Sequence, residues 1–163
     1  MGALEFLGKE LEGVALPGLV SARSLTVGDV RVGMLSFGAL ENIEGTLFVL
    51  APAGTVAGPP LLPPVPGDFE VEAFTISGFD LLEVAGDTTL KVLDGPVSLP
   101  SLLRTSELTV RGGMTSLALP SLGQTDGLTI LNADGLWDAI DESNIAGTVL
   151  MWNNGTGLQQ CPT

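Results

Sequence analysis

The stretch from Val97 to Ile130 repeats one short pattern after twenty residues. Ser98–Leu102, SLPSL, is followed by ELTV at Glu107–Val110, and Ala118–Leu122, ALPSL, is followed at the same distance by GLTI. A unit of this length with two short apolar segments cannot bury its apolar side alone, and it buries that side once copies stack. The repeat therefore predicts a solenoid.

The same repeated pattern continues along the chain. It gives seven pairs of apolar residues, which we call anchors. In each pair the first anchor precedes a turn and the second opens a strand-like segment, and the two lie eight to ten residues apart. The pairs are Leu16 with Leu25, Phe37 with Leu47, Val65 with Phe74, Leu82 with Leu90, Leu99 with Leu108, Leu119 with Leu128, and Ile140 with Val149. Successive second anchors are separated by 22, 27, 16, 18, 20 and 21 residues, so the third and fourth pairs break the regular spacing.

The strand-like segments alternate apolar and polar residues, which is typical of half-buried strands. Leu108 should therefore point inward, in one ladder with Leu99, Leu119 and Leu128, while Thr109 points outward. At 163 residues the chain suits one domain. We predict an all-β, single-domain β-solenoid of about seven coils over residues 14–153, with a closing segment at 154–163.

The first thirteen residues show helical spacing instead. Leu4, Leu7 and Leu11 recur at that spacing, and Lys9 lies among glutamates. This predicts a short amphipathic helix at residues 1–13 that covers the open strand edge of the first coil, the alternative being a helix that binds a partner. A basic segment followed by a continuous apolar run is missing, so no signal peptide is expected.

Residues 51–64, APAGTVAGPPLLPP, interrupt the repeat and account for the spacing of 27 residues. The window from Gly45 to Gly67 has no charged residue, but its six prolines would break a spanning helix, so membrane insertion is not expected. We expect an extended loop with Leu61 and Leu62 exposed. It either lies against its own coil or docks a partner.

Composition excludes several functions. Nineteen acidic against six basic residues give a net charge of −13, which disfavours nucleic acid as a partner. Histidine is absent and Cys161 is the one cysteine, so no intramolecular disulfide, Cys/His metal site or histidine-based triad can form. The pair Glu70 and Glu72 has no aromatic-lined cleft predicted around it, and Asn132–Asp138 lacks the ligand spacing of a calcium loop. We expect no cofactor and no enzymatic activity.

The outward residues of the strand-like segments are the best binding candidates. They include Thr26, Phe48, Thr75, Lys91, Thr109 and Thr129. This face could bind a protein or glycan, or mediate self-assembly together with Leu61 and Leu62. A lattice of threonine hydroxyl and methyl groups could alternatively match ice, although Phe48 and Lys91 disturb its regularity. Threonine also favours exposed strands without any further role.

The succession of LPSL, a spacer, an LTV or LTI strand and then Gly or Asn resembles the receptor L-domain-like repeats, irregular relatives of leucine-rich repeats. The resemblance covers Leu16–Cys161 and implies a module of receptor ectodomains or surface proteins, hence an extracellular or cell-surface location. The closing NNGTGLQQC is similar to the ending of such arrays, which implies a terminal capping role for Cys161. In a eukaryotic secretory pathway Asn154 would be a candidate for N-glycosylation.

Overall fold

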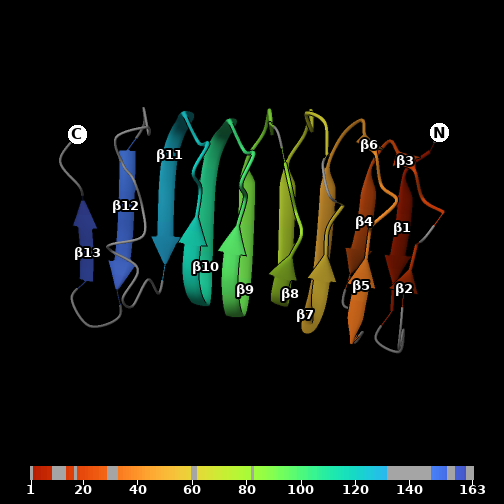
Figure 1. Cartoon of the computed structure of the whole chain (residues 1–163), viewed down its shortest axis with the longest axis horizontal. Helices are drawn as coiled ribbons and strands as arrows, with labels where there is room; N and C mark the ends of the chain where they lie inside the picture. Colours follow the sequence, from red (N-terminus) through yellow and green to blue (C-terminus); the bar gives the residue numbers. More distant parts are fainter. Residues whose placement is uncertain are drawn as a thin grey trace.

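The structure, a computed structural model, describes residues 2–8, 14–16, 18–28, 33–59, 62–81, 83–131, 148–153 and 157–160. Over these ranges the chain forms a β-solenoid of about six turns and contains no helix (Figure 1). Parallel strands stack along one long axis, so the predicted class of fold is confirmed, whereas the predicted seven coils are not.

One run of strands forms the main stack, and its members pair in sequence order. They are β1 (Leu4–Leu7), β4 (Leu25–Gly28), β7 (Leu47–Ala57), β8 (Phe69–Ser77), β9 (Thr88–Ser98), β10 (Arg104–Ala118), β11 (Gln124–Leu131), β12 (Thr148–Asn153) and β13 (Gly157–Gln160). All these pairings are parallel except that of β13, which runs antiparallel to β12. Short strands complete the early coils: β2 (Val14–Ala15), β3 (Ser21–Ala22), β5 (Met34–Ser36) and β6 (Asn42–Ile43).

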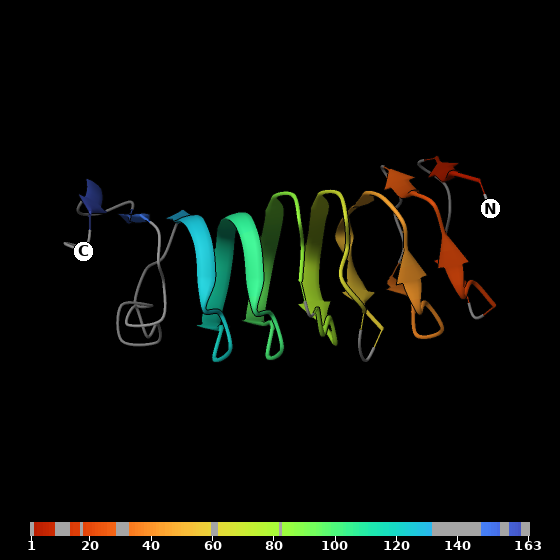
Figure 2. The ribbon, with the colours of Figure 1, turned by 90° about the horizontal axis from the view of Figure 1, so that it is seen from above.

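The long strands bend, so their two halves lie on different sides of the coil (Figures 1 and 2). In β10 the bend falls at Gly112, whose φ is +120° and where the register with β9 shifts. A Cβ at Gly112 would overlap the carbonyl oxygen of Val92, so only glycine fits this bend. We call the part of each long strand that leads up to the bend the first side and the part after the bend the second side. The segment that leads from the turn to the next first side is the return side, and in β10 it includes residues 104–106.

Each coil passes from its second side to its return side through a turn, and the turns project along one side of the stack (Figure 2). The amide of Leu102 donates to the carbonyl of Leu99 at 3.4 Å, and that of Leu122 donates to Leu119 at 3.2 Å. Proline favours the second position of such a turn, where Pro100 and Pro120 lie. The LPSL motif is therefore the turn that closes a coil.

The interior is filled by columns of apolar side chains. Leu25, Leu47, Phe69, Leu108 and Leu128 occupy one column of the first side and are all fully buried. Leu108 and Leu128 are neighbours there, as predicted, but Leu99 and Leu119 belong to the turns and Leu119 is only partly buried. The single ladder of four leucines that the sequence suggested is therefore two separate columns.

The strand register corrects the two irregular repeats. Phe69, not Phe74, pairs with Leu47, and Thr88, not Leu90, pairs with Phe69. Phe74 is 45% exposed and Val65 is buried in the return side rather than at a turn. With these assignments the steps from Leu25 through β11 become 22, 22, 19, 20 and 20 residues. The coil length is thus nearly constant.

The predicted loop at 51–64 is also corrected. β7 continues to Ala57, and Leu62 is fully buried and bridged to Leu81. Pro52 lies where the register between β7 and β8 is interrupted, at the bend, which a residue without an amide donor tolerates. Its described residues, 51–59 and 62–64, belong to an ordinary coil, and Leu61 lies outside the described residues.

The N-terminal helix is not formed over residues 2–8. Leu4–Leu7 is strand β1, which pairs in parallel with β4 from Leu4 opposite Leu25 to Leu7 opposite Gly28. The backbone hydrogen bonds offered by the edge of β4 outweigh the weak local preference of this short segment for a helix. Residues 9–13 lie outside the described ranges.

Candidate functional site

Four of the predicted surface residues lie in one column on the first side. Strand register places the following residues side by side across neighbouring strands: Glu5, Thr26, Phe48, Glu70, Thr89, Thr109 and Thr129. Thr89, Thr109 and Thr129 are consecutive, and we call them the threonine column. Phe48 and Glu70 separate this column from Thr26, so hydroxyl groups do not line the whole stack.

The remaining candidates fall elsewhere. Lys91 lies in the next column, with its Nζ 2.6 Å from Oε1 of Glu72. Thr75 is on the second side, where its Oγ1 lies 2.8 Å from Oγ1 of Thr55. Leu62 is buried, so it cannot contact a partner, and both Leu61 and Asn154 are outside the described residues.

The outward residues of the first side are mostly charged on β8, β9 and β10, and we call this three-strand surface the charged face. Five carboxylates and two cations stand on it: Asp68, Glu70, Glu72, Asp87 and Glu107 with Lys91 and Arg111. Asp68 is also tied to the backbone, because its Oδ1 accepts the amide of Asp87 at 3.0 Å. Lys91 neutralises Glu72, but the surface as a whole remains acidic.

The outward residues of the second side differ sharply, and we call this surface the uncharged face. It spans β5 and the later halves of β7, β8, β9 and β10, which follow one another in the stack. It presents ten residues that are uncharged and not buried: Met34, Ser36, Thr55, Ala57, Thr75, Ser77, Pro96, Ser98, Ser116 and Ala118. The exposed carboxylate of Asp94 lies at the bend of β9, on the border with the charged face. Composition alone could not reveal this separation of charge, because it depends on where each strand bends.

Two large apolar side chains stand at the border between the two faces. Phe74 and Leu93 follow directly after Ala73 and Val92, which are paired across β8 and β9. They are 45% and 44% exposed, respectively. An exposed aromatic and an exposed leucine on neighbouring strands form a small apolar patch beside the uncharged face.

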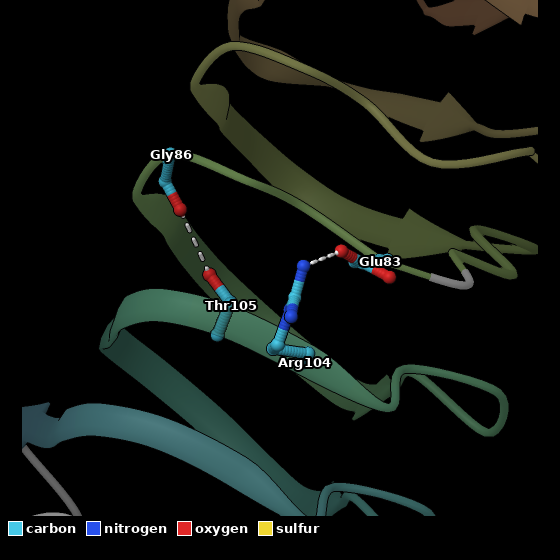
Figure 3. A network of polar contacts seen from close by, with 4 residues as sticks. All are labelled: Glu83, Gly86, Arg104 and Thr105. Atoms are coloured by element: carbon cyan, nitrogen blue, oxygen red, sulfur yellow. Dashed lines mark hydrogen bonds and ion pairs between the residues drawn. The ribbon is translucent and has the colours of Figure 1, made fainter.

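The return side carries a groove of about 250 Å³ with a mostly polar lining. Its walls are Val84, Ala85, Arg104, Thr105, Ser106, Gln124 and Asp126. Arg104 pairs with Glu83 and the hydroxyl of Thr105 donates to the carbonyl of Gly86 at 3.2 Å (Figure 3). The groove forms where the coil becomes one residue shorter. Val84 and Thr105 occupy equivalent positions in neighbouring coils, but Thr88 follows Val84 by four residues, whereas its partner Leu108 follows Thr105 by three.

Glu70 with Glu72 and the segment Asn132–Asp138 are the positions that the sequence analysis considered for catalysis and for calcium binding. Glu70 and Glu72 lie two residues apart on the charged face, where both are partly exposed. No cluster of three or more His, Cys, Asp or Glu side chains there could hold a metal ion. Asn132–Asp138 lies outside the described ranges. No described segment is a helix of the length and apolarity needed to cross a membrane.

Comparisons of this chain with protein-family models, with curated proteins and with solved structures found no match. The β-solenoid fold therefore rests on the strand register and burial described above. The likeness to receptor L-domain-like repeats rests on the motifs of the sequence.

Proposed function

We propose that this chain is a non-catalytic interaction module that binds a protein or glycan partner through the outward surface of its solenoid. The observation that carries the proposal is the uncharged face, which presents ten uncharged and accessible residues on an acidic molecule. Protein interfaces are depleted of charge at their centres and enriched in aromatic residues and methionine. Met34 and Phe74, 61% and 45% exposed, lie on and beside this face.

The resemblance to receptor L-domain-like repeats supports this proposed interaction role. Its turn motif closes the coils at Leu99–Leu102 and Leu119–Leu122, and its LTV and LTI segments form β10 and β11. Side chains that offer hydroxyl groups without charge, such as Thr55, Ser77 and Ser98, suit neutral glycans and polar peptide surfaces.

A matched pair of substitutions tests the proposal. Ser77→Lys places a cation at the middle of the uncharged face, and Thr109→Lys places the same charge on the charged face. We expect native protein to bind to members of an array of neutral oligosaccharides, Ser77→Lys to lose that binding, and Thr109→Lys to keep it. Binding that survives Ser77→Lys and disappears in Thr109→Lys would contradict the assignment of the uncharged face.

Ice binding is the second candidate, and the threonine column is the observation that favours it. Thr89, Thr109 and Thr129 repeat at the spacing of neighbouring strands, about 4.8 Å. The column ranks second because Asp87 and Glu107 flank it on one side and Lys91 and Arg111 on the other. Inhibition of ice recrystallisation that is abolished by Thr109→Tyr and unaffected by Ser77→Lys would favour ice over a glycan or protein.

A further inference from the structure

We propose that the uncharged face docks a second copy of this chain, face to face, in a weak dimer with two-fold symmetry. This inference deepens the proposed function and rests on it, because it names the partner of the same surface. It follows from the distribution of charge over the coil, the sizes of the side chains on the face, and the area that the face offers.

Charge distribution selects the surface through which two copies can meet. Each copy carries a net charge of −13, so copies repel one another at long range. Contact through the charged face would bring the carboxylates of both copies, among them Asp68, Glu70 and Glu107, into one interface. The return side exposes further carboxylates, including Glu41 and Glu44. On the uncharged face, like charges do not meet at the contact itself.

Side-chain size favours one orientation of the two copies. The uncharged face runs from Met34 on β5, which is 61% exposed, to the small Ser116 and Ala118 on β10. β8 is the middle of its five strands. A two-fold axis in the interface along β8 lays β5 of one copy over β10 of the other. The large Met34 then meets the small end of the face, and Ser77 meets its own symmetry mate.

The area of the face sets the expected affinity. Five strands about 4.8 Å apart and about five residues long cover roughly 400 Å² per copy, or about 800 Å² in total. Stable protein interfaces usually bury at least about 1,200 Å². We therefore expect a transient dimer that appears at concentrations of about 0.1 mM and above.

Analytical ultracentrifugation of the full chain tests this inference. Across about 10 μM to 1 mM protein the fraction of dimer should rise with concentration. It should rise further between about 50 and 500 mM NaCl, because salt screens the repulsion between two acidic copies. Ser77→Lys should stay monomeric, since its two lysines would face each other across the axis. Thr109→Lys, with the same change in net charge, should dimerise at least as well as native protein.

A mixing experiment makes the test specific for the two-fold contact. Ser77→Lys and Ser77→Asp should each be monomeric alone, and an equimolar mixture should form the dimer, because opposite charges then meet across the axis. Circular dichroism should show the native spectrum for both variants.

Three outcomes would overturn self-docking: monomer at every concentration and salt level, dimer lost in Thr109→Lys but kept in Ser77→Lys, or no dimer in the mixture. If native protein stays monomeric while its binding to neutral oligosaccharides still depends on Ser77, the dimer is contradicted, whereas the proposed interaction function is supported. Ice-recrystallisation inhibition abolished by Ser77→Lys in a monomeric protein would assign the same face to ice and overturn the dimer. Loss of both self-association and oligosaccharide binding would remove both proposals.

Discussion

Three buried threonines show how single hydroxyl groups join neighbouring coils. Thr88, Thr105 and Thr125 are at most 2% exposed, so their hydroxyl groups depend on partners within the protein. Thr105 and Thr125 lie two residues before carbonyls that their hydroxyl groups reach, at 3.2 Å for Glu107 and 2.8 Å for Gly127. Each also reaches a carbonyl of the preceding coil. In these two coils the threonine hydroxyl group therefore stabilises the short corner between the return side and the first side.

The first prediction concerns Thr105. The variant Thr105→Val keeps the volume but leaves the carbonyl of Gly86 and the hydroxyl of Thr88 with one partner fewer. The free energy of unfolding should fall by about 1–3 kcal/mol. Because the hydroxyl groups of Thr88 and Thr105 lie 2.9 Å apart, the double variant with Thr88→Val should lose less than the sum of the two single losses. Urea denaturation measures these differences.

The ion pair beside Thr105 provides the control. Arg104 is 51% exposed and Glu83 29% exposed, so water screens their attraction. Glu83→Gln should change the free energy of unfolding by less than about 1 kcal/mol. A larger loss in Glu83→Gln than in Thr105→Val would show that the ion pair, rather than the buried hydroxyl group, holds the coils together here.

At the scale of elements, the bend is what divides the surface into two chemistries. β10 stays one continuous strand of 15 residues because Gly112 adopts a conformation that other residues avoid. In β10 the outward residues Glu107, Thr109 and Arg111, which precede the bend, stand on the charged face, and the outward residues Ser116 and Ala118, which follow it, stand on the uncharged face. The position of one glycine thus decides which residues can reach the same partner.

The second prediction concerns this bend. Gly112→Ala adds a Cβ that meets the carbonyl of Val92 and strains a left-handed φ, which should cost about 1–3 kcal/mol from strain alone. Gly123→Ala is the matched control, since the closest atom to its added Cβ is a carbonyl oxygen at 4.0 Å. Thermal unfolding should separate the two variants clearly. Similar melting temperatures would show that β10 can bend without a glycine.

Much of this element structure could be predicted from the sequence, and the failures have physical causes. The LPSL turns and the inward leucines of β10 and β11 follow from local periodicity and are confirmed. The register of β8 does not follow from local periodicity. Its nine residues contain two phenylalanines, and either Phe69 or Phe74 could point inward; only the pairing with Leu47 selects Phe69. The spacing of Leu4 and Leu7 predicts a helix, whereas the alternation of Leu4 with Phe6 fits the strand that forms, in which these two residues lie opposite Leu25 and Val27. The pairing with β4 that decides between them lies some twenty residues away.

The surface was harder to predict than the core. Thr109 and Thr129 point outward on the first side, as the alternation predicts. Thr75 lies on the second side instead, because Phe69 rather than Phe74 is the inward residue of β8 that pairs with Leu47. The uncharged face was missed for the same reason, since it is visible only once the bends are known. The one signal in the sequence is the run without charge between Gly45 and Gly67, and its prolines favour a loop at 51–64 over the strand that forms there.

The whole molecule is held together by contacts between successive coils, so its stability is distributed along the stack. β9 and β10 are paired on both sides, whereas among the described strands β1 pairs with β4 alone. In such arrays each unit depends on its neighbours, and the ends open at a lower free energy than the middle.

The third prediction is therefore a gradient of hydrogen exchange. Amides in the first-side halves of β9 and β10 should exchange most slowly and those of β1 much faster, because opening β1 breaks a single interface. Native-state exchange followed by NMR or mass spectrometry measures this. Equal protection along the stack would contradict the gradient and show that all coils unfold as one unit.

Thr105 and Thr125 occupy equivalent positions twenty residues apart, so one coil can be added to the stack as a complete unit. These residues pair across β10 and β11 and make matching hydrogen bonds, so a duplicated segment 105–124 inserted after Gln124 would meet native neighbours at both joints. Each duplication would lengthen the molecule by one strand spacing, about 4.8 Å, and would leave both ends unchanged. Gene duplication can thus change the distance between the two ends of such a fold in increments of a single coil.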